Sequence, residues 1–324
     1  MKTPVLYVVV PCYNEEEVLT ETTARLTEKF DKLTADGKIS KDSRVLYVND
    51  GSVDGTWELI KKFHAADERF SGVNLSRNRG HQNALLAGLE TAAKYADAVV
   101  SMDADLQDDI NAVDEMLEKF AGGCEIVYGV RKARKKDSFF KRYTAESFYK
   151  ITNKMGGNII FNHADYRLMS KRAVLALGEY KESNLFLRGL VPMLGFKSDL
   201  VFYERAERFA GESKYPLKKM LAFAYEGITS LTVTPIRMIR NFGIFLSVMG
   251  FLALAATITL TALGIIWEGW IVASIVGLLA GIIELSVGII GDYVGKTYIE
   301  SKHRPRYIID EVLNTLPGID GENK

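Results

Sequence analysis

Two aspartates one residue apart are the first feature of the sequence that could do chemistry. Asp103 and Asp105 follow the short, largely apolar stretch 99–102, and Gln107 comes next. Because side chains alternate along a strand, a strand ending here would place both carboxylates on one side of the chain. Two acidic groups held together favour a bound cation, and oxygen ligands suit Mg²⁺ or Mn²⁺. For an isolated pair, a solvated turn that only ends a strand is the alternative.

Other polar residues follow other strand-like runs. The apolar runs are residues 5–10, 44–48, 73–75, the stretch ending at Met102, and 126–130. The polar residues that follow the first three runs are Tyr13, Asn14, Glu15, Asp50 and Arg77. Helical patterns separate the runs, at residues 18–33, 57–63, 82–95 and 112–120. This alternation predicts an α/β fold with an open, mostly parallel sheet and helices on both faces.

Ligands of such sheets bind at the carboxyl ends of the strands, which is where these polar residues fall. No G-x-G-x-x-G opens a helix, and no G-x-x-x-x-G-K-[ST] occurs, so dinucleotide and P-loop sites lose their main support. The remaining hypothesis is a nucleotide sugar whose diphosphate is held by a metal.

Composition narrows the class of partner. The chain has 41 basic and 41 acidic residues, so it has no overall attraction for nucleic acid, and none is expected as a partner. Cys12 and Cys124 lack metal-binding spacing and do not suggest a disulfide framework. The first apolar run is too short and too β-branched for a secretory signal, so the N-terminal region is expected in the cytosol.

The last third of the chain contains two long apolar stretches. Residues 242–267 carry no charge, and at about 1.5 Å per residue they would reach roughly 39 Å, enough to cross a bilayer. Residues 270–290 form a second stretch with one acid, Glu284. Basic residues flank both stretches, which predicts cytoplasmic ends and an outward-facing turn. An acid in lipid should face a helix partner, so a homo-oligomer is expected.

A basic stretch with interleaved aromatic residues runs from Arg131 to Arg142. A solvated charged face is the ordinary explanation of such a run. An amphipathic segment lying on an anionic bilayer fits the pattern better, and residues 215–231 have the character of a second interfacial helix. Because Arg131 directly follows a strand, it is the first choice for a contact with a phosphate.

Three motifs occur together in the first third of the chain: Pro11-x-Tyr13-Asn14-Glu15, Asn49-Asp50-Gly51-Ser52-x-Asp54-Gly55-Thr56, and Asp103-Ala104-Asp105-Leu106-Gln107-Asp108. They resemble the signature of family 2 inverting glycosyltransferases of GT-A fold. Residues 165–169 and 205–215 narrow the resemblance to the polyprenyl-phosphate glycosyltransferases, the branch that includes dolichol-phosphate mannose synthase and the bactoprenol-phosphate glucosyltransferases. The resemblance covers nearly the whole chain.

The resemblance implies roles for individual residues. The residues expected to bind the nucleotide sugar are Pro11, Tyr13, Glu15, Asp50, Asp103 and Ala104. Asp105 and Gln107 would hold a Mg²⁺ or Mn²⁺ ion on the diphosphate. The expected catalytic residues are Asp103, Asp105 and Asp165, with Asp165 orienting the donor sugar. The residues expected to bind the diphosphate or the acceptor phosphate are Arg131, Arg205, Arg208, Ser213 and Lys214.

The sequence as a whole predicts a membrane-anchored enzyme. It would comprise a cytosolic GT-A domain (1–215), an interfacial amphipathic region (216–241), two transmembrane helices (242–295) and a cytosolic tail (296–324). The enzyme would move one sugar, with UDP-glucose the favoured donor, to polyprenyl (undecaprenyl) phosphate for cell-envelope glycan modification. It would do so at the cytoplasmic face of the plasma membrane.

Two alternatives stay open at this point. A processive polysaccharide synthase would share the catalytic domain, but the Gln-x-x-Arg-Trp motif of such synthases is absent. A non-catalytic, membrane-anchored subunit that only binds nucleotide sugars would retain the same motifs.

Overall fold

Valine-rich strands make up the centre of the fold. The computed structural model describes residues 3–132, 163–182, 185–204, 236, 239, 241–246, 248–249, 252, 259 and 269–314. Four parallel strands lie side by side in the order β4 (Ala98–Ser101), β1 (Leu6–Cys12), β2 (Arg44–Asn49) and β3 (Phe70–Leu75). Almost all of their residues are buried, as expected of strands that are covered on both faces.

Further strands extend this centre on both sides. They are β5 (Ile126–Arg131), β6 (His163–Ser170), β7 (Ser198–Tyr203) and β8 (Ile309–Leu313). Among the described residues the order is β7-β5-β6-β4-β1-β2-β3-β8. β7 is parallel to β5, whereas β6 is antiparallel to β4 and β5, and β8 is antiparallel to β3. The prediction of a mostly parallel α/β sheet is therefore confirmed, although the two antiparallel strands were not predicted.

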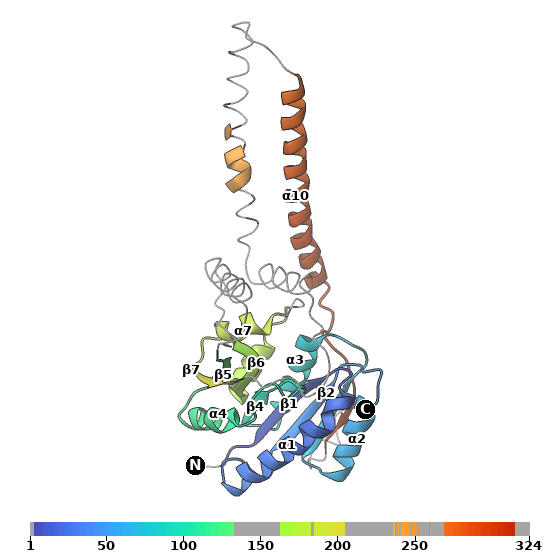
Figure 1. Ribbon diagram of the computed structural model, residues 1–324, viewed down its shortest axis with the longest axis vertical. Coiled ribbons are helices and arrows are strands. Elements are labelled where there is room, and N and C mark those ends of the chain that lie inside the picture. Colours follow the sequence, from blue (N-terminus) through green and yellow to red (C-terminus); the bar gives the residue numbers. More distant parts are fainter. Residues whose placement is uncertain are drawn as a thin grey trace.

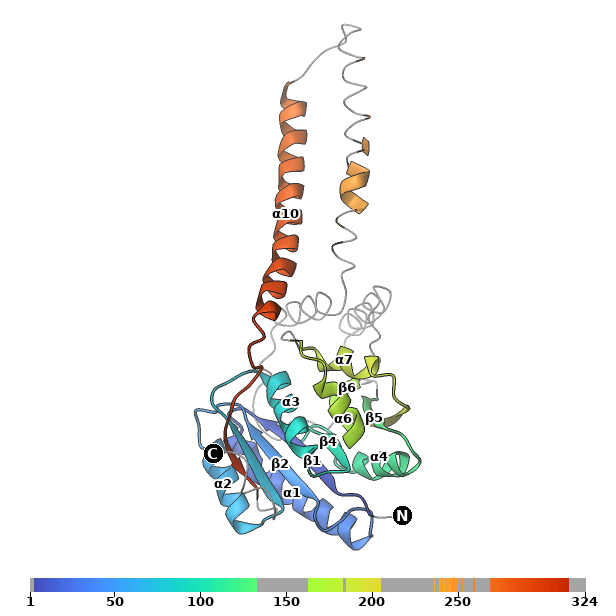
Figure 2. The same cartoon turned by 180° about the vertical axis from the view of Figure 1, so that it is seen from behind.

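Helices cover both faces of the sheet, as predicted. One face carries α1 (Glu16–Ala35), α2 (Thr56–Ala66) and α4 (Ala112–Ala121) (Figure 1). The other face carries α3 (His81–Ala92), α6 (Lys171–Gly178) and α7 (Leu187–Met193) (Figure 2). Alternation along β1 divides the core, because Val8 and Val10 pack in the first layer while Tyr7 and Val9 pack in the second.

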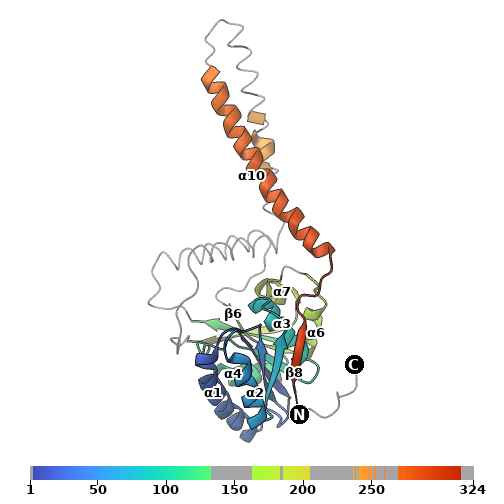
Figure 3. The same ribbon diagram turned by 90° about the vertical axis from the view of Figure 1, so that its right-hand side faces the viewer.

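A long helix, α10 (Gly269–Ser301), extends away from the α/β part of the molecule (Figure 3). Its exposed side chains include Ile283 and Val287, which are 62% and 61% exposed. No helix within the described ranges combines the length and apolar character required of a membrane span. Most of the predicted first span, residues 242–267, lies outside those ranges, which include only 242–246, 248–249, 252 and 259 of it.

The chain returns from α10 to the α/β part. Arg306 donates through Nη1 to the Tyr180 carbonyl oxygen at 2.8 Å and through Nη2 to Glu90 Oε1 at 3.1 Å. The Tyr307 hydroxyl also bonds to Glu90, which lies on α3. β8 then adds to the sheet beside β3. The segment that follows α10 therefore anchors the C-terminal end of α10 to α3.

Close packing of α3 on the sheet gives a test of the fold. A Cβ added at Gly88 would lie 2.4 Å from Val9 Cγ1 and 2.7 Å from Val48 Cγ2. Gly88→Ala should therefore lower the free energy of unfolding by about 1–3 kcal/mol, measured by denaturant unfolding of the purified protein.

Gly178→Ala is the matched control, since its Cβ would meet only the flexible Glu90 side chain, with Oε1 at 3.5 Å and Cγ at 4.0 Å. That control should leave stability unchanged or slightly higher. Equal stability of the two variants would contradict the close α3–sheet contact.

Candidate active site

The carboxyl ends of β1, β2, β4 and β5 meet at one edge of the sheet. β1, β2 and β4 are parallel, and β5 runs in the direction of β4 because both are antiparallel to β6. The sequence-predicted residues of the described part of the chain all lie at this edge or in the loops that leave it. The topology thus brings together segments that are distant in sequence.

The loops that follow β1 and β2 are bonded to each other. The Asn14 N–H donates to Ser52 Oγ at 3.0 Å, and the Val53 N–H donates to Asn14 Oδ1 at 3.0 Å. Asn14 has a positive φ of 54°, which asparagine tolerates better than most residues. The Glu15 N–H donates to Thr56 Oγ1 at 3.0 Å. These bonds fix one wall of the candidate site.

Pro11, Tyr13 and Glu15 lie along this wall. Pro11 is buried inside β1, beyond Val9, where the pairing with β4 ends, so its missing N–H breaks no bond on that side. Tyr13 is 43% exposed, which leaves its ring accessible to a ligand. Glu15 precedes α1 and is half-buried. Their binding roles stay predictions.

Asp50 is buried and fixes a second loop. Its Oδ1 accepts from the Arg79 N–H at 2.6 Å and its Oδ2 accepts from the Gly80 N–H at 2.9 Å. Burial raises the pKa of Asp50 above its ordinary value despite these two bonds. Asp50 therefore holds the loop that leads into α3, and its predicted contact with the base stays a prediction.

The loop between β4 and α4, residues 102–111, carries Asp103, Asp105 and Asp108 and is named the aspartate loop. Hydrogen bonds within the loop and to α1 hold its backbone. Ala104 is buried, and its carbonyl oxygen accepts from Thr22 Oγ1 at 2.8 Å. The backbone N–H of the buried Gln107 donates to Asp105 Oδ1 at 3.2 Å. The Asp103 side chain is 34% exposed. The loop thus has a fixed backbone and keeps Asp103 accessible.

Asp165 lies close to the end of β4, on the neighbouring strand β6. Ser101, the last residue of β4, pairs with Arg167, and its hydroxyl donates to the Asp165 carbonyl oxygen. Asp165 is buried, and it accepts from Arg167 Nη2 at 2.7 Å and from Arg188 Nη2 at 2.9 Å. Burial alone would raise the pKa of Asp165, but the charges of Arg188 and Arg167 outweigh burial and hold it far below its usual range.

His81 stands between these carboxylates at the start of α3. Its Nε2 lies 3.8 Å from Asp103 Oδ1 and 3.8 Å from Asp165 Oδ2. Both distances are too long for hydrogen bonds. The imidazole is therefore close to both acids without a hydrogen bond to either.

A second polar cluster joins Asp108, Arg131 and Tyr203. Asp108 Oδ1 accepts from the Tyr203 hydroxyl at 2.5 Å and lies 3.4 Å from Arg131 Nη2. Burial, followed by the negative charge of Asp103, raises the pKa of Asp108 to about 6. The predicted phosphate ligand Arg131 is thus beside the aspartate loop.

The donor atoms at this edge fit a hard divalent cation. No three His, Cys, Asp or Glu side chains in the described ranges converge so as to hold a metal alone. Asp108 Oδ2 is buried and has no hydrogen-bond partner among the described residues. Carboxylate and carboxamide oxygens with surplus negative charge suit Mg²⁺ or Mn²⁺ completed by substrate phosphates. Asp105 and Gln107 stay the predicted ligands.

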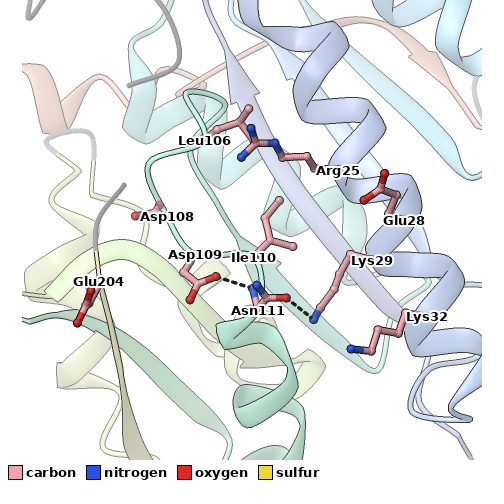
Figure 4. Close-up of a pocket in the computed structure, with 10 residues that line it drawn as sticks. All are labelled: Arg25, Glu28, Lys29, Lys32, Leu106, Asp108, Asp109, Ile110, Asn111 and Glu204. Atoms are coloured by element: carbon pink, nitrogen blue, oxygen red, sulfur yellow. Dashed lines mark hydrogen bonds between the residues drawn. The ribbon is translucent and has the colours of Figure 1, made fainter. Parts of the chain in front are cut away.

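A groove of about 500 Å³ lies beside the same loop, between α1 and residues 106–111 (Figure 4). Its lining carries both signs of charge, with Lys32 and Arg25 facing Asp109 and Glu204 across it. This mixture favours no single class of charged ligand. The predicted phosphate ligands Arg205, Arg208, Ser213 and Lys214 lie outside the described residues.

Sequence reasoning assigned no role to four residues of this edge: His81, Asp108, Arg188 and Tyr203. Asp108 had a local signal, since it stands three residues after Asp105 in the same acidic motif. His81 follows a strand within a turn-rich loop. Arg188 and Tyr203 had none, because only tertiary pairing carries them to the site.

The charge balance at Asp165 is testable through stability. Asp165→Asn leaves the fully buried Arg167 without its charged partner, which should lower the free energy of unfolding by about 3–5 kcal/mol. Because the folded-state pKa of Asp165 is depressed, its stabilisation is present above the ordinary carboxyl pKa and is lost as pH falls. The deficit of the variant should stay constant from about pH 8 to about pH 5 and shrink below about pH 4.

Asp199→Asn is the matched control. Asp199 pairs with Lys119 at 2.8 Å, but its side chain is 48% exposed, so its loss should change stability little. A deficit in Asp165→Asn no larger than in this control would contradict the buried ion pair.

Comparison with known proteins identifies the family of the chain. A family model described as "Glycosyl transferase family 2" matches residues 7–178. The chain is 50% identical over 308 residues to "Uncharacterized glycosyltransferase YkoT" of Bacillus subtilis (strain 168), covering 95% of this chain and 91% of that protein.

Two further relatives carry a more specific name. The chain is 37% identical over 308 residues to "Prophage bactoprenol glucosyl transferase homolog" of Escherichia coli (strain K12), covering 94% of this chain and 98% of that protein. It is 37% identical over 305 residues to "Bactoprenol glucosyl transferase" of Shigella phage SfV, covering 93% and 96%. The matched region contains all three motifs and the strands that carry them, and the chain belongs to glycosyl transferase family 2.

Proposed function

We propose that this protein transfers one sugar from a nucleotide sugar, with UDP-glucose the favoured donor, to the phosphate of a polyprenyl lipid such as undecaprenyl phosphate. One observation carries the proposal: the carboxylates of Asp103, Asp105 and Asp108 lie close to the Arg131 guanidinium at one edge of the sheet. The names and near-complete coverage of the bactoprenol relatives support the choice of acceptor.

The donor would lie along the wall built by β1, β2 and β4. Tyr13 offers an exposed ring for the base, with Pro11, Glu15 and Asp50 completing the pocket. Asp103 and Ala104 would contact the ribose or the sugar. Asp105 and Gln107 would hold a Mg²⁺ or Mn²⁺ ion on the diphosphate. The chemistry supplied by such an ion, when bound, is neutralisation of charge on the departing nucleoside diphosphate.

The acceptor needs little activation. A phosphate monoester has a second pKa of about 6, so at neutral pH it is largely a dianion and already nucleophilic. The chain must therefore place the phosphate oxygen in line with the anomeric carbon, and direct displacement inverts that centre. Arg131, with Arg205, Arg208, Ser213 and Lys214, would hold the phosphates.

Asp165 suits an orienting role better than that of a general base. A carboxylate whose pKa is held far below its usual range by Arg188 and Arg167 is a poor proton acceptor. It can still accept hydrogen bonds from sugar hydroxyls. Its nearness to His81, which lies 3.8 Å from both Asp165 and Asp103, supports a position beside the donor sugar.

We further propose that the C-terminal third anchors the protein in a membrane. The uncharged residues 242–267 support a first span. The exposed apolar side chains of α10, such as Ile283, Val287 and Val294, support a second. The catalytic part would face the cytoplasm at the plasma membrane. We propose the same domain boundaries that the sequence predicts, and a homo-oligomer.

Transfer to lipid tests the function directly. Full-length protein should move labelled glucose from UDP-glucose to extractable polyprenyl phosphate, and a chelator should stop it. Asp105→Ala should lower the rate by about 10³ or more, because it removes charge stabilisation of the leaving group. Asp109→Asn is the matched control, since Asp109 is an acid of the same loop that faces the groove.

The products separate the alternatives. A single sugar on lipid supports the proposal, whereas a polymer would indicate a processive synthase. Nucleotide binding without transfer would indicate a non-catalytic subunit. Near-wild-type turnover by Asp105→Ala would contradict the metal assignment.

Membrane anchoring is tested by extraction. The full chain should stay with membranes after a carbonate wash at high pH. Ile283→Lys combined with Val287→Lys should weaken retention, because each charge near a bilayer centre costs about 2.5–3.5 kcal/mol. Leu175→Lys, at an exposed apolar position on α6, is the control. Release of the wild-type chain by carbonate would contradict anchoring.

A further inference from the structure

Three segments deliver Asp108, Arg131 and Tyr203 to one point. Arg131 ends β5, Tyr203 ends β7, and the two residues are partners in the parallel register. Asp108 comes from the loop after β4. Arg131 Nε donates to Tyr203 Oη at 3.0 Å, and the Tyr203 hydroxyl donates to Asp108 Oδ1 at 2.5 Å. The guanidinium is thus held by the tyrosine and, at 3.4 Å, by the carboxylate.

The exposure of these side chains is unequal. Asp108 is 1% exposed, whereas Arg131 is 25% exposed. Apolar side chains of similar volume can replace a buried ion pair with little loss of stability, so stability alone does not explain a charge at position 108. The exposed quarter of Arg131 leaves it within reach of an incoming phosphate.

The tyrosine that links them is itself fixed. The Tyr203 ring meets the Tyr166 ring edge to face, with centroids 5.2 Å apart. The Tyr166 hydroxyl donates to the Asp109 carbonyl oxygen at 2.8 Å, which ties this pair of rings to the aspartate loop. A fixed phenol bonded to Nε sets the plane of the guanidinium.

We propose that Asp108 and Tyr203 are positioning residues that orient the Arg131 guanidinium toward the phosphate of the acceptor. The proposal rests on the proposed function. A planar guanidinium binds phosphate through a fork of N–H donors, so its orientation decides how well the phosphate oxygen is placed. The acidic loop that faces the donor would thereby also set the acceptor site.

A second role for Asp108 must be distinguished from the positioning of Arg131. Asp108 is close enough to Asp103 and Asp105 for their charges to act on it, so it could serve the cation and the donor instead. The two assignments differ in which substrate responds. A role in positioning Arg131 changes acceptor affinity, and a role at the cation changes the dependence on donor and metal.

Steady-state kinetics, with the concentrations of acceptor and donor varied in turn, test the positioning role. Tyr203→Phe and Asp108→Asn should each raise the acceptor KM about tenfold, the effect of losing one hydrogen bond to a charged group. Donor KM and Mn²⁺ dependence should not change. In an Arg131→Lys background the same substitutions should add less than about twofold, because their target is gone. Tyr7→Phe, which removes a buried hydroxyl without a hydrogen-bond partner among the described residues, is the control.

Binding of geranyl phosphate, measured by calorimetry without donor, keeps this test separate from that of the proposed function. Both variants should bind the probe about tenfold more weakly than the wild type, even in a preparation that transfers no sugar. An unchanged acceptor KM and probe affinity, or a shift confined to donor KM or Mn²⁺ dependence, would overturn the positioning role. So would a wild-type chain that does not bind the probe. Tyr203→Phe keeps its ring and stays informative if Asp108→Asn does not fold.

Discussion

Negative charge crowded at one edge of the sheet is the constraint on which the site depends. Four carboxylates gather there: Asp103, Asp105, Asp108 and Asp165. Asp165 is balanced inside the protein by Arg167 and Arg188, so it is ionised and fixed. The pKa of Asp108 rises to about 6 because burial and its acidic neighbours are only partly offset by Arg131 and Tyr203. The negative charge of Asp103 and Asp105 that remains favours binding of a cation together with a diphosphate.

The same arrangement divides the edge into two sides. On one side His81 lies 3.8 Å from Asp103 and from Asp165, and the proposed function assigns this side to the donor sugar. On the other side Arg131 is 25% exposed, and the proposed function assigns it to the phosphate of the acceptor. Asp108 joins the two sides, since it shares a loop with Asp105 and a bond with Tyr203. In the proposed function, placement of both substrates would therefore depend on the single loop that follows β4.

Much of this could be predicted from local sequence. Valine-rich runs bounded by polar residues predicted β1 to β5, and the parallel order predicted that Asp103, Asp105 and Asp50 would share an edge. Burial on both faces makes such strands nearly continuous apolar runs, which are easy to recognise. The acidic loop was recognised because two carboxylates stand at fixed spacing after a strand. The motifs then indicated family 2 glycosyltransferases, and the family match confirmed that membership.

The rest depended on pairing that no local pattern encodes. β6 inserts between β4 and β5 in the opposite direction, and this insertion brings Asp165 to the end of β4, close to the loop that carries Asp103. β8 reaches β3 only after α10, so its partner lies more than two hundred residues earlier in the chain. Arg188 and Tyr203 look like ordinary helix and strand residues in sequence. Their contacts with Asp165 and Asp108 arise from the same non-local topology.

The central claim concerns a cation held by the acidic edge together with the nucleotide sugar. Electron paramagnetic resonance of free Mn²⁺ would measure binding to the purified chain, with and without UDP-glucose, and in Asp105→Ala. The account predicts one bound Mn²⁺ per chain that UDP-glucose tightens and that Asp105→Ala abolishes. Binding that is absent from the wild type, or that is unaffected by UDP-glucose and by the loss of Asp105, would contradict it.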